Sequence, residues 1–172
     1  KFTINNKSIL TNLNPLHFDN SVFDIYASIL NGACLVPFQK KELLETKSLI
    51  LKINKLNCSI WFSVPSLLNF LIEVYKKKTF SKLKIKKMIF GGERFPINSI
   101  KKIHNYFNTT EFFNVSGPTE CTCICSAHRV TRKEINTLEN IPVGNINSYF
   151  QYKILSISSK KNEGELCLIG PS

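Results

Sequence analysis

Between residues 33 and 115 the chain alternates short apolar runs with longer amphipathic stretches. The short runs have the length and composition of buried strands, and the longer ones repeat apolar residues at helical spacing. In the last long stretch Ile97, Ile100 and Ile103 share one face, whereas lysines lie opposite. This alternation predicts a parallel sheet covered by helices on both faces. We expect strands at 33–36, 59–62, 87–90 and 111–115, and helices at 41–56, 66–77 and 97–107.

The flanks of this core follow different patterns. A helix is expected at 22–30, because Ser21 and Asp24 have capping-box spacing and Gly32 stands where helices often end in a left-handed residue. After residue 115 the apolar runs have no helices between them, and they predict strands at 123–130, 151–156 and 165–169. The expected fold is α/β, a mostly parallel sheet flanked by helices with added mixed or antiparallel strands, in one partial domain, 1–172.

Charge and hydropathy exclude several classes of protein. The net charge of +11 comes mainly from lysine, with only three arginines among 23 basic residues. Nucleic-acid-binding proteins usually rely on arginine with interleaved aromatic residues, so solvated lysine-rich surfaces are the favoured interpretation over an RNA-binding patch. No run of about eighteen apolar residues and no signal-peptide core occur. We therefore expect a cytoplasmic protein with neither nucleic acid nor membrane as partner.

The six cysteines lack the paired spacing of a disulfide framework, which favours buried thiols in a reducing compartment. Cys121, Cys123 and Cys125 alternate at strand spacing. Without a companion cluster of His or Cys they are a weak metal signal. We interpret them as residues on one face of a strand.

Standard nucleotide-binding and hydrolase motifs are absent from the sequence. None of the seven glycines belongs to a G-x-x-x-x-G-K, G-x-G-x-x-G or G-x-S-x-G pattern. His104 beside an apolar helix face and His128 in a strand pattern are interpreted as structural, whereas His17 is a candidate pocket residue. Classical P-loop, dinucleotide-binding and serine-hydrolase sites are thus excluded within these residues.

Three loops have the composition of ligand sites, namely 18–21, 91–94 and 114–120. Each lies at the carboxyl end of a predicted strand or at the start of a helix, which is where open α/β sheets bind ligands. In the last loop a Gly-Pro turn is followed by the Thr119 hydroxyl and the Glu120 carboxylate, groups suited to phosphate and Mg²⁺. The alternative is an ordinary turn with a solvated acidic residue.

At these residues the chain resembles a known family. The segments FDNSVFDIYASILNGACLV, MIFGGERFP, FFNVSGPTECT and IPVGN, with the final GELCLIGPS, are similar in order and spacing to core motifs of amino-acid adenylation domains. These domains occur in non-ribosomal peptide synthetases and D-alanine:carrier-protein ligases, and FDNSVFDIY with the terminal GPS is particularly close to the latter. The resemblance implies activation of an amino acid with ATP and Mg²⁺, followed by transfer to the phosphopantetheine thiol of an acyl or peptidyl carrier protein.

The resemblance also implies roles for individual residues. Glu120 corresponds to the Mg²⁺-associated catalytic carboxylate, Thr119 to a phosphate contact, and Asn114 to the residue that bonds adenine. The nucleotide site is completed by the segments around these residues, Gly92, Glu93, Arg94, Ser116, Gly117 and Pro118.

Asp19 corresponds to the carboxylate that pairs with the α-ammonium of the substrate, and its place before a helix favours its ionised form. Its neighbours in the substrate pocket would be Asn20, Phe23, Phe62, Ile89, Gly91, Val115, Cys123 and Ile124. These side chains predict a small or medium, uncharged substrate side chain.

Two positions depart from the family pattern. Ser116 stands where Tyr is usual, which removes an aromatic surface for adenine, and Gly91 stands where D-alanine ligases carry Cys. D-alanine is therefore not inherited as the substrate.

The resemblance further places the triphosphate loop upstream of residue 1, and the ribose-binding Asp, the hinge and the small C-terminal domain with its catalytic Lys downstream of residue 172. We therefore expect the chain to be a fragment of the large N-terminal domain that cannot complete adenylation by itself. An acyl- or aryl-acid:CoA ligase and a degenerate, non-catalytic binding homologue remain as alternatives.

Overall fold

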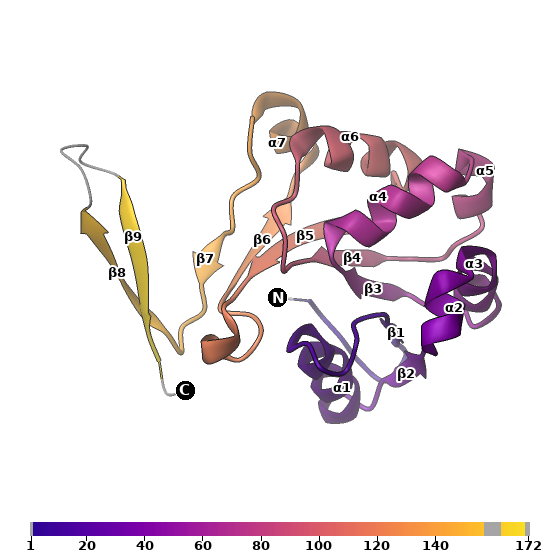
Figure 1. Cartoon of the computed structure of the whole chain (residues 1–172), viewed down its shortest axis with the longest axis horizontal. Helices are drawn as coiled ribbons and strands as arrows, with labels where there is room; N and C mark the ends of the chain where they lie inside the picture. The colour runs from indigo at the N-terminus through magenta and orange to yellow at the C-terminus, as the bar shows by residue number, and fades with distance from the viewer. Residues whose placement is uncertain (1, 157–162, 171–172) are drawn as a thin grey trace.

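The structure, a computed structural model, describes residues 2–156 and 163–170 (Figure 1). Within these residues a seven-stranded sheet has the order β2-β1-β3-β4-β5-β6-β7, and β8 and β9 form a separate antiparallel pair. The strands are β1 (Ile9–Asn12), β2 (Cys34–Pro37), β3 (Ile60–Ser63), β4 (Lys87–Phe90), β5 (Glu111–Ser116), β6 (Ser126–Val130), β7 (Asn145–Ile146), β8 (Gln151–Ser156) and β9 (Gly164–Ile169).

The first five strands of the sheet order are parallel, and β6 and β7 are added antiparallel, so the predicted α/β class is confirmed. The four strands predicted between residues 33 and 115 are all present. The sequence analysis missed β1, which has only two apolar residues, Ile9 and Leu10, followed by the polar Thr11 and Asn12. Its place between β2 and β3 comes from pairing with both, for example Leu10 with Leu35 and Ile60.

Two apolar clusters cover the two faces of the sheet. One contains Trp61, Met88 and Phe112 of the strands with side chains of α3 to α7, and the other contains Phe62 and Ile89 with side chains of α1. Covering on both faces was predicted and is confirmed (Figure 1). The helices are α1 (Asn20–Leu30), α2 (Lys40–Leu44), α3 (Thr46–Lys55), α4 (Pro65–Val74), α5 (Lys77–Phe80), α6 (Ile97–Tyr106) and α7 (Arg132–Thr137), with a 3₁₀ turn, η1 (Thr119–Cys121).

Two predicted helices are interrupted. The helix expected at 41–56 breaks at Glu45, whose ψ of 75° separates α2 from α3. The helix expected at 66–77 ends at Val74, because Tyr75 is extended and its hydroxyl lies 2.7 Å from Thr46 Oγ1 on α3. The second break involves a contact between segments far apart in the sequence, which local periodicity does not encode.

The capping box predicted at the start of α1 is wrong. The helix begins at Asn20. Asp19 is its N-cap residue, but the Asp19 side chain makes no capping hydrogen bond. Ser21 Oγ instead donates to Phe18 O (2.9 Å), and Asp24 is buried in the second turn. The left-handed conformation predicted for Gly32 is confirmed, with φ of +60°.

The prediction that Cys121, Cys123 and Cys125 lie on one face of a strand is also wrong. Cys121 belongs to η1, Thr122 and Cys123 have φ of +51° and +72°, and β6 begins only at Ser126. The chain turns back sharply here, since Cys125 N donates to Ser116 O (3.0 Å). All six cysteines are free thiols. Four are buried as predicted, but Cys34 is exposed and Cys167 is half-buried.

The β8–β9 hairpin stands apart from the main sheet (Figure 1). Both strands were predicted, but as additions to the sheet, and this part of the prediction is wrong. The hairpin leaves Tyr152, Ile154 and Leu166 exposed. Pro171 and Ser172 of the GPS segment lie outside the described residues.

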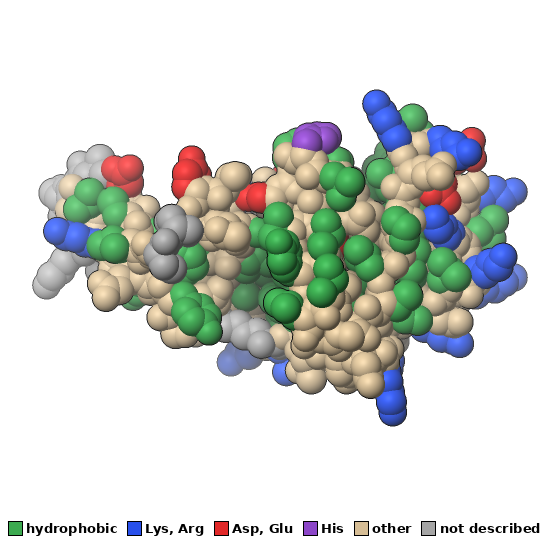
Figure 2. Space-filling model, turned by 90° about the horizontal axis from the view of Figure 1, so that it is seen from below, with side chains coloured by type: hydrophobic (Ala, Val, Ile, Leu, Met, Phe, Trp, Pro, Cys, Tyr) green, Lys and Arg blue, Asp and Glu red, His purple; other side chains and the backbone are tan. Residues whose placement is uncertain are grey.

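The lysine-rich stretches lie on the surface, as predicted. On the face shown in Figure 2 the basic side chains are scattered, mostly along the margin of the helical part. No helix within the described residues combines the length and the apolarity that crossing a membrane requires.

Candidate functional site

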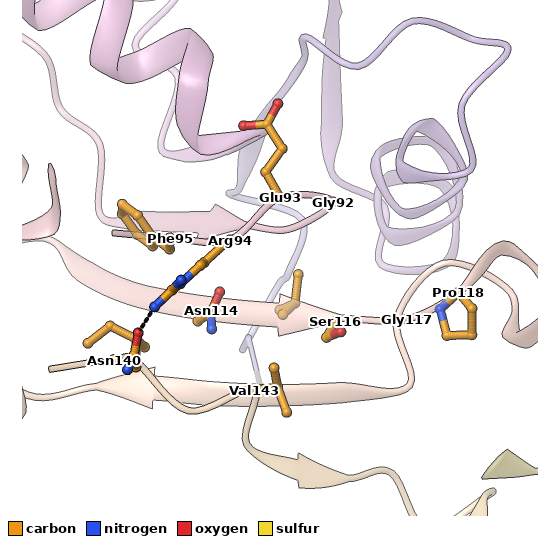
Figure 3. Close-up of a pocket in the computed structure, with 12 residues that line it drawn as sticks. Gly92, Glu93, Arg94, Phe95, Asn114, Ser116, Gly117, Pro118, Asn140 and Val143 are labelled. Atoms are coloured by element: carbon orange, nitrogen blue, oxygen red, sulfur yellow. Dashed lines mark hydrogen bonds between the residues drawn. The ribbon is translucent and has the colours of Figure 1, made fainter. Parts of the chain in front are cut away.

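The three predicted loops meet at the carboxyl edge of the parallel strands. Two hollows lie there, each with a volume of about 520 Å³. The first, which we call the α1 hollow, is lined at the start of α1 by Asp19 and Asn20 and from η1 by Thr119. The second, the β5 hollow, is lined by Asn114, Ser116 and further residues (Figure 3). The two adjoin, because both are lined by Gly92, Glu93, Gly117 and Pro118.

Asn114 lies at the floor of the β5 hollow. It is in β5, opposite Phe90 of β4, and is only 6% exposed. Its Nδ2 donates to Pro142 O (2.9 Å), which leaves the amide oxygen as the acceptor of this side chain. The position was predicted, but its contact with the segment after α7 was not.

The segment 140–143 forms a wall of the β5 hollow that the sequence analysis did not assign. Pro96 and Asn140 form an isolated bridge, and the Arg94 guanidinium donates to Asn140 Oδ1 across the hollow (Figure 3). Ile141 and Val143 line the same hollow. Ile141, Pro142 and Val143 belong to the IPVGN segment, to which the sequence analysis gave no site role, and Asn140 directly precedes it.

Close backbone packing requires glycine at two positions of the site. Gly92 has φ of +84°, and a Cβ there would lie 3.2 Å from Asn20 Nδ2. A Cβ at Gly91 would lie 2.7 Å from Val115 Cγ2 and 3.1 Å from Val115 O. The Gly-Gly pair thus lets the end of β4 approach both α1 and β5.

The predicted apolar pocket residues are brought together, but they pack against one another. Phe62, Ile89, Val115 and Cys123 are buried in one cluster, against which the partly buried Phe23 and Ile124 pack. The rings of Phe23 and Phe62 meet edge to face with centroids 5.2 Å apart. This cluster lies on the α1 face of the sheet.

Burial raises the pKa of Cys123 to about 12, with further contributions from the negative charges of Asp19 and Asp24. The Cys123 thiol is therefore protonated at neutral pH, and its Sγ lies 3.9 Å from Asn20 Oδ1. It has the character of a packing residue and not of a nucleophile.

Glu93 faces both hollows and also caps a helix. Its carboxylate accepts hydrogen bonds from Ser66 N (3.1 Å) and Ser66 Oγ (2.9 Å) at the start of α4. An acidic group at this helix terminus satisfies a free amide and interacts favourably with the helix dipole. The 91–94 loop is thereby tied to α4.

Thr119 and Glu120 are both exposed in η1, and Thr119 lines the α1 hollow. In the part of the chain that the structure describes, no group of three or more His, Cys, Asp and Glu is placed to hold a metal ion. A single carboxylate is nevertheless compatible with Mg²⁺, which usually keeps water and phosphate oxygens among its ligands.

The histidines lie outside the two hollows' linings. His128 on β6 is 2.9 Å from Glu134 of α7, and His104 packs beside the ring of Phe112. Burial lowers the pKa of His104, with a smaller contribution from Arg132. His17 is exposed beside Phe18, so its prediction as a pocket residue gains no support.

The chain is similar in sequence to one family of enzymes and to several known proteins. The sequence model of one family, described as AMP-binding enzyme, matches residues 2–172. A D-alanine--D-alanyl carrier protein ligase of Bacillus cytotoxicus is 29% identical over 175 residues, covering 99% of this chain and 35% of that protein. Bacitracin synthase 1 of Bacillus licheniformis is 30% identical over 171 residues, covering 97% of this chain and 3% of the synthase.

The fold agrees with a solved structure. The adenylation domain AlmE of Vibrio cholerae, in complex with glycyl-adenosine-5'-phosphate, superposes with a TM-score of 0.77 at 23% identity, covering 96% of this chain and 29% of that chain. The chain spans about a third of the length of the D-alanine ligase relative, 35%.

Proposed function

The chain belongs to the AMP-binding enzyme family, and from that membership we propose that it is part of an ATP-dependent ligase that activates an amino acid. In the proposed reaction the carboxylate of the amino acid attacks the α-phosphate of ATP, and pyrophosphate leaves. The phosphopantetheine thiol of a carrier protein then attacks the carbonyl of the resulting aminoacyl-adenylate, so that a thioester forms and AMP leaves. The name of the Bacillus cytotoxicus relative, a carrier protein ligase, supports this last step.

The observation that carries the proposal is the pair of adjoining hollows. A reaction that joins two substrates needs both held side by side, with the reacting atoms in contact. The α1 hollow offers a carboxylate, and the β5 hollow offers a buried amide, with Gly92, Glu93, Gly117 and Pro118 between them. We assign the amino acid to the α1 hollow and the nucleotide to the β5 hollow.

Asp19 would bind the α-ammonium of the amino acid in this arrangement. Its carboxylate lines the α1 hollow and stands at the N-terminus of α1. A plain carboxylic acid has no ammonium group, so its binding would leave the Asp19 carboxylate desolvated without a counter-charge. The site would therefore favour amino acids over plain carboxylic acids. The proposed substrate side chain is small or medium and uncharged, and the apolar side chains of Leu13, Val64 and Leu67 in the lining of the α1 hollow support its being uncharged.

The β5 hollow supports ATP as the second substrate. The amide oxygen of Asn114 can accept a hydrogen bond from the exocyclic amine of adenine, while its nitrogen is held by Pro142 O. Thr119 and Glu120 follow the Gly-Pro turn at the side where the hollows adjoin. Glu120 would hold Mg²⁺, which when bound neutralises charge that builds on the phosphates.

We also propose that the 172 residues are the central portion of a larger N-terminal adenylation domain. The share of the relatives that the chain covers supports this. The hairpin supports it as well, because its exposed Tyr152, Ile154 and Leu166 would be buried in a larger domain. The proposed activity is therefore that of the intact protein, and we predict that the isolated segment does not complete adenylation.

ATP–pyrophosphate exchange by the intact protein tests the proposal, with L- and D-amino acids screened beside plain carboxylic acids. We expect exchange with one or a few small amino acids, and its loss in Asp19→Asn. Glu73→Gln is the matched control, because Glu73 is an exposed acid on α4 that pairs with Lys102 away from both hollows.

Two alternatives give different results in the same assay. Exchange only with plain carboxylic acids, unaffected by Asp19→Asn, would indicate an acyl- or aryl-acid:CoA ligase. Exchange with no acid at all would favour a non-catalytic binding homologue, which the small Ser116 in the nucleotide hollow makes the second candidate.

A further inference from the structure

A buried carboxyl group joins three segments behind the α1 hollow. Asp24 lies in the second turn of α1 and is 0% exposed. Its Oδ2 accepts hydrogen bonds from Asn12 Nδ2 (3.2 Å), at the end of β1, and from Asn14 Nδ2 (3.1 Å), in the following segment. Asn14 Nδ2 also approaches Phe62 O of β3 (3.3 Å).

The second oxygen of this carboxyl group has no hydrogen-bond partner within the described residues. Desolvation raises the pKa of Asp24 to about 7, although the hydrogen bonds from Asn14 and Asn12 act in the opposite direction. A buried carboxylate with one unpartnered oxygen and no cation beside it is costly, so the folded arrangement favours the protonated carboxyl group.

The segment that Asp24 holds is the one that shapes the α1 hollow. Asn14 is itself only 7% exposed and lines that hollow, and the segment from Leu13 to Asp19 ends in the proposed ammonium-binding carboxylate. The position of Asp19 relative to the sheet thus depends on the contact between α1, β1 and β3 that Asp24 makes.

We propose that Asp24 is a positioning residue of the α1 hollow, which holds segment 13–19 in place through Asn12 and Asn14 and releases it when its carboxyl group ionises. The proposal rests on the proposed function only for the identity of the ligand. The tie between the three segments stands on the geometry alone.

The direction of the pH effect follows from linkage. Burial keeps the Asp24 carboxyl group protonated while segment 13–19 is held, whereas the group ionises near its ordinary pKa of 3.8 once the segment is released. The tie is therefore complete below about pH 4, weakens as the pH rises from there to about 7, and stays at its weakened level above pH 7. The ionisable group that interacts with it is Cys123, in the segment between η1 and β6, whose thiol stays protonated. The exposed His17 lies within the segment itself.

Hydrogen–deuterium exchange of the intact protein tests the tie without any ligand. Wild type and Asp24→Asn are compared at pH 5.5 and pH 8.5, since Asn keeps the acceptor for Asn12 and Asn14 but does not ionise. With a pKa of about 7, wild type should lose protection in segment 13–19 by up to about thirtyfold at pH 8.5. Asp24→Asn should keep it, and peptides of α4 and α6 should be equally protected in both.

His17→Gln controls for the only imidazole in the segment and should behave as wild type. Equal protection in wild type and Asp24→Asn at pH 8.5 would overturn the proposal, and so would a loss of protection spread over α4 and α6. This comparison needs no leucine or alanine variant, which would leave the Asn12 and Asn14 donors unpaired and threaten folding.

Kinetics provide the second readout. In wild type the KM for the amino acid should rise between pH 5.5 and about 7 and level off above it, while the KM for ATP does not rise, and Asp24→Asn should remove this rise. A KM for ATP that rises in parallel would indicate a merely structural role and contradict the proposal. If no amino acid supports ATP–pyrophosphate exchange, the proposed function fails. The hydrogen–deuterium exchange of segment 13–19 still decides the role of Asp24.

Discussion

The substitution Gly91→Ala gives a sharp test of how the end of β4 packs against β5. An added Cβ would lie 2.7 Å from Val115 Cγ2, 3.1 Å from Val115 O and 3.7 Å from Phe62 Cε2. Ordinary carbon–carbon contacts are about 3.5–4.0 Å, so the methyl group of Val115 must move by about 1 Å. Val115 is buried and β-branched, which leaves it few alternative rotamers.

The expected cost follows from this overlap. Overpacking of a buried cluster costs about 1–3 kcal/mol, and the lower entropy of the unfolded chain with alanine offsets about 0.4–1 kcal/mol of it. We therefore expect Gly91→Ala to lower the free energy of unfolding by about 1–2 kcal/mol.

A double-mutant cycle with Val115→Ala assigns this cost to the methyl contact. Val115→Ala removes the atom that would lie at 2.7 Å, but the carbonyl oxygen at 3.1 Å remains, so the relief should be partial. We expect a favourable coupling of about 1 kcal/mol between the two substitutions. The assay is urea unfolding followed by the fluorescence of Trp61, the single, fully buried tryptophan of the chain.

Two results would refute this reasoning. A Gly91→Ala variant as stable as wild type would show that the strand ends separate without cost. An equal loss of stability with and without the Val115 methyl groups would show that the strain lies elsewhere. In the first case the junction of β4 and β5 would be more deformable than the structure indicates.

Three further results are expected. Ser116→Tyr should tighten ATP binding to the intact protein by about threefold to tenfold in calorimetry, by restoring an aromatic surface, whereas Ser116→Ala should not. Glu93→Ala should lower the free energy of unfolding by about 0.5–1 kcal/mol, because the Ser66 amide at the start of α4 loses its acceptor. Hydrogen bonds from Thr131 hold the pKa of Glu134 below its ordinary value of 4.5. In urea unfolding, wild type should therefore have a higher free energy of unfolding than Glu134→Gln. This difference should be complete above pH 4.5 and vanish as the pH falls through the lowered pKa of Glu134.

The sequence by itself predicted the parts of the site that depend on local pattern. Strand and helix periods are properties of neighbouring residues, so the alternation between residues 33 and 115 identified four parallel strands and the sheet that they form. Since parallel strands end at one edge, the loops carrying Asp19, Gly92 and Thr119 were expected there, and the structure brings them together around the α1 hollow.

The tertiary structure alone decided which groups face one another. Asp24 has the spacing of a capping residue, yet it is buried against Asn12 and Asn14, because α1 packs on the end of β1, a strand with too few apolar residues to predict. Asn140 lines the β5 hollow and forms a bridge with Pro96. Such contacts join residues far apart in the chain, and their energies come from desolvation and packing that exist only once the sheet has formed.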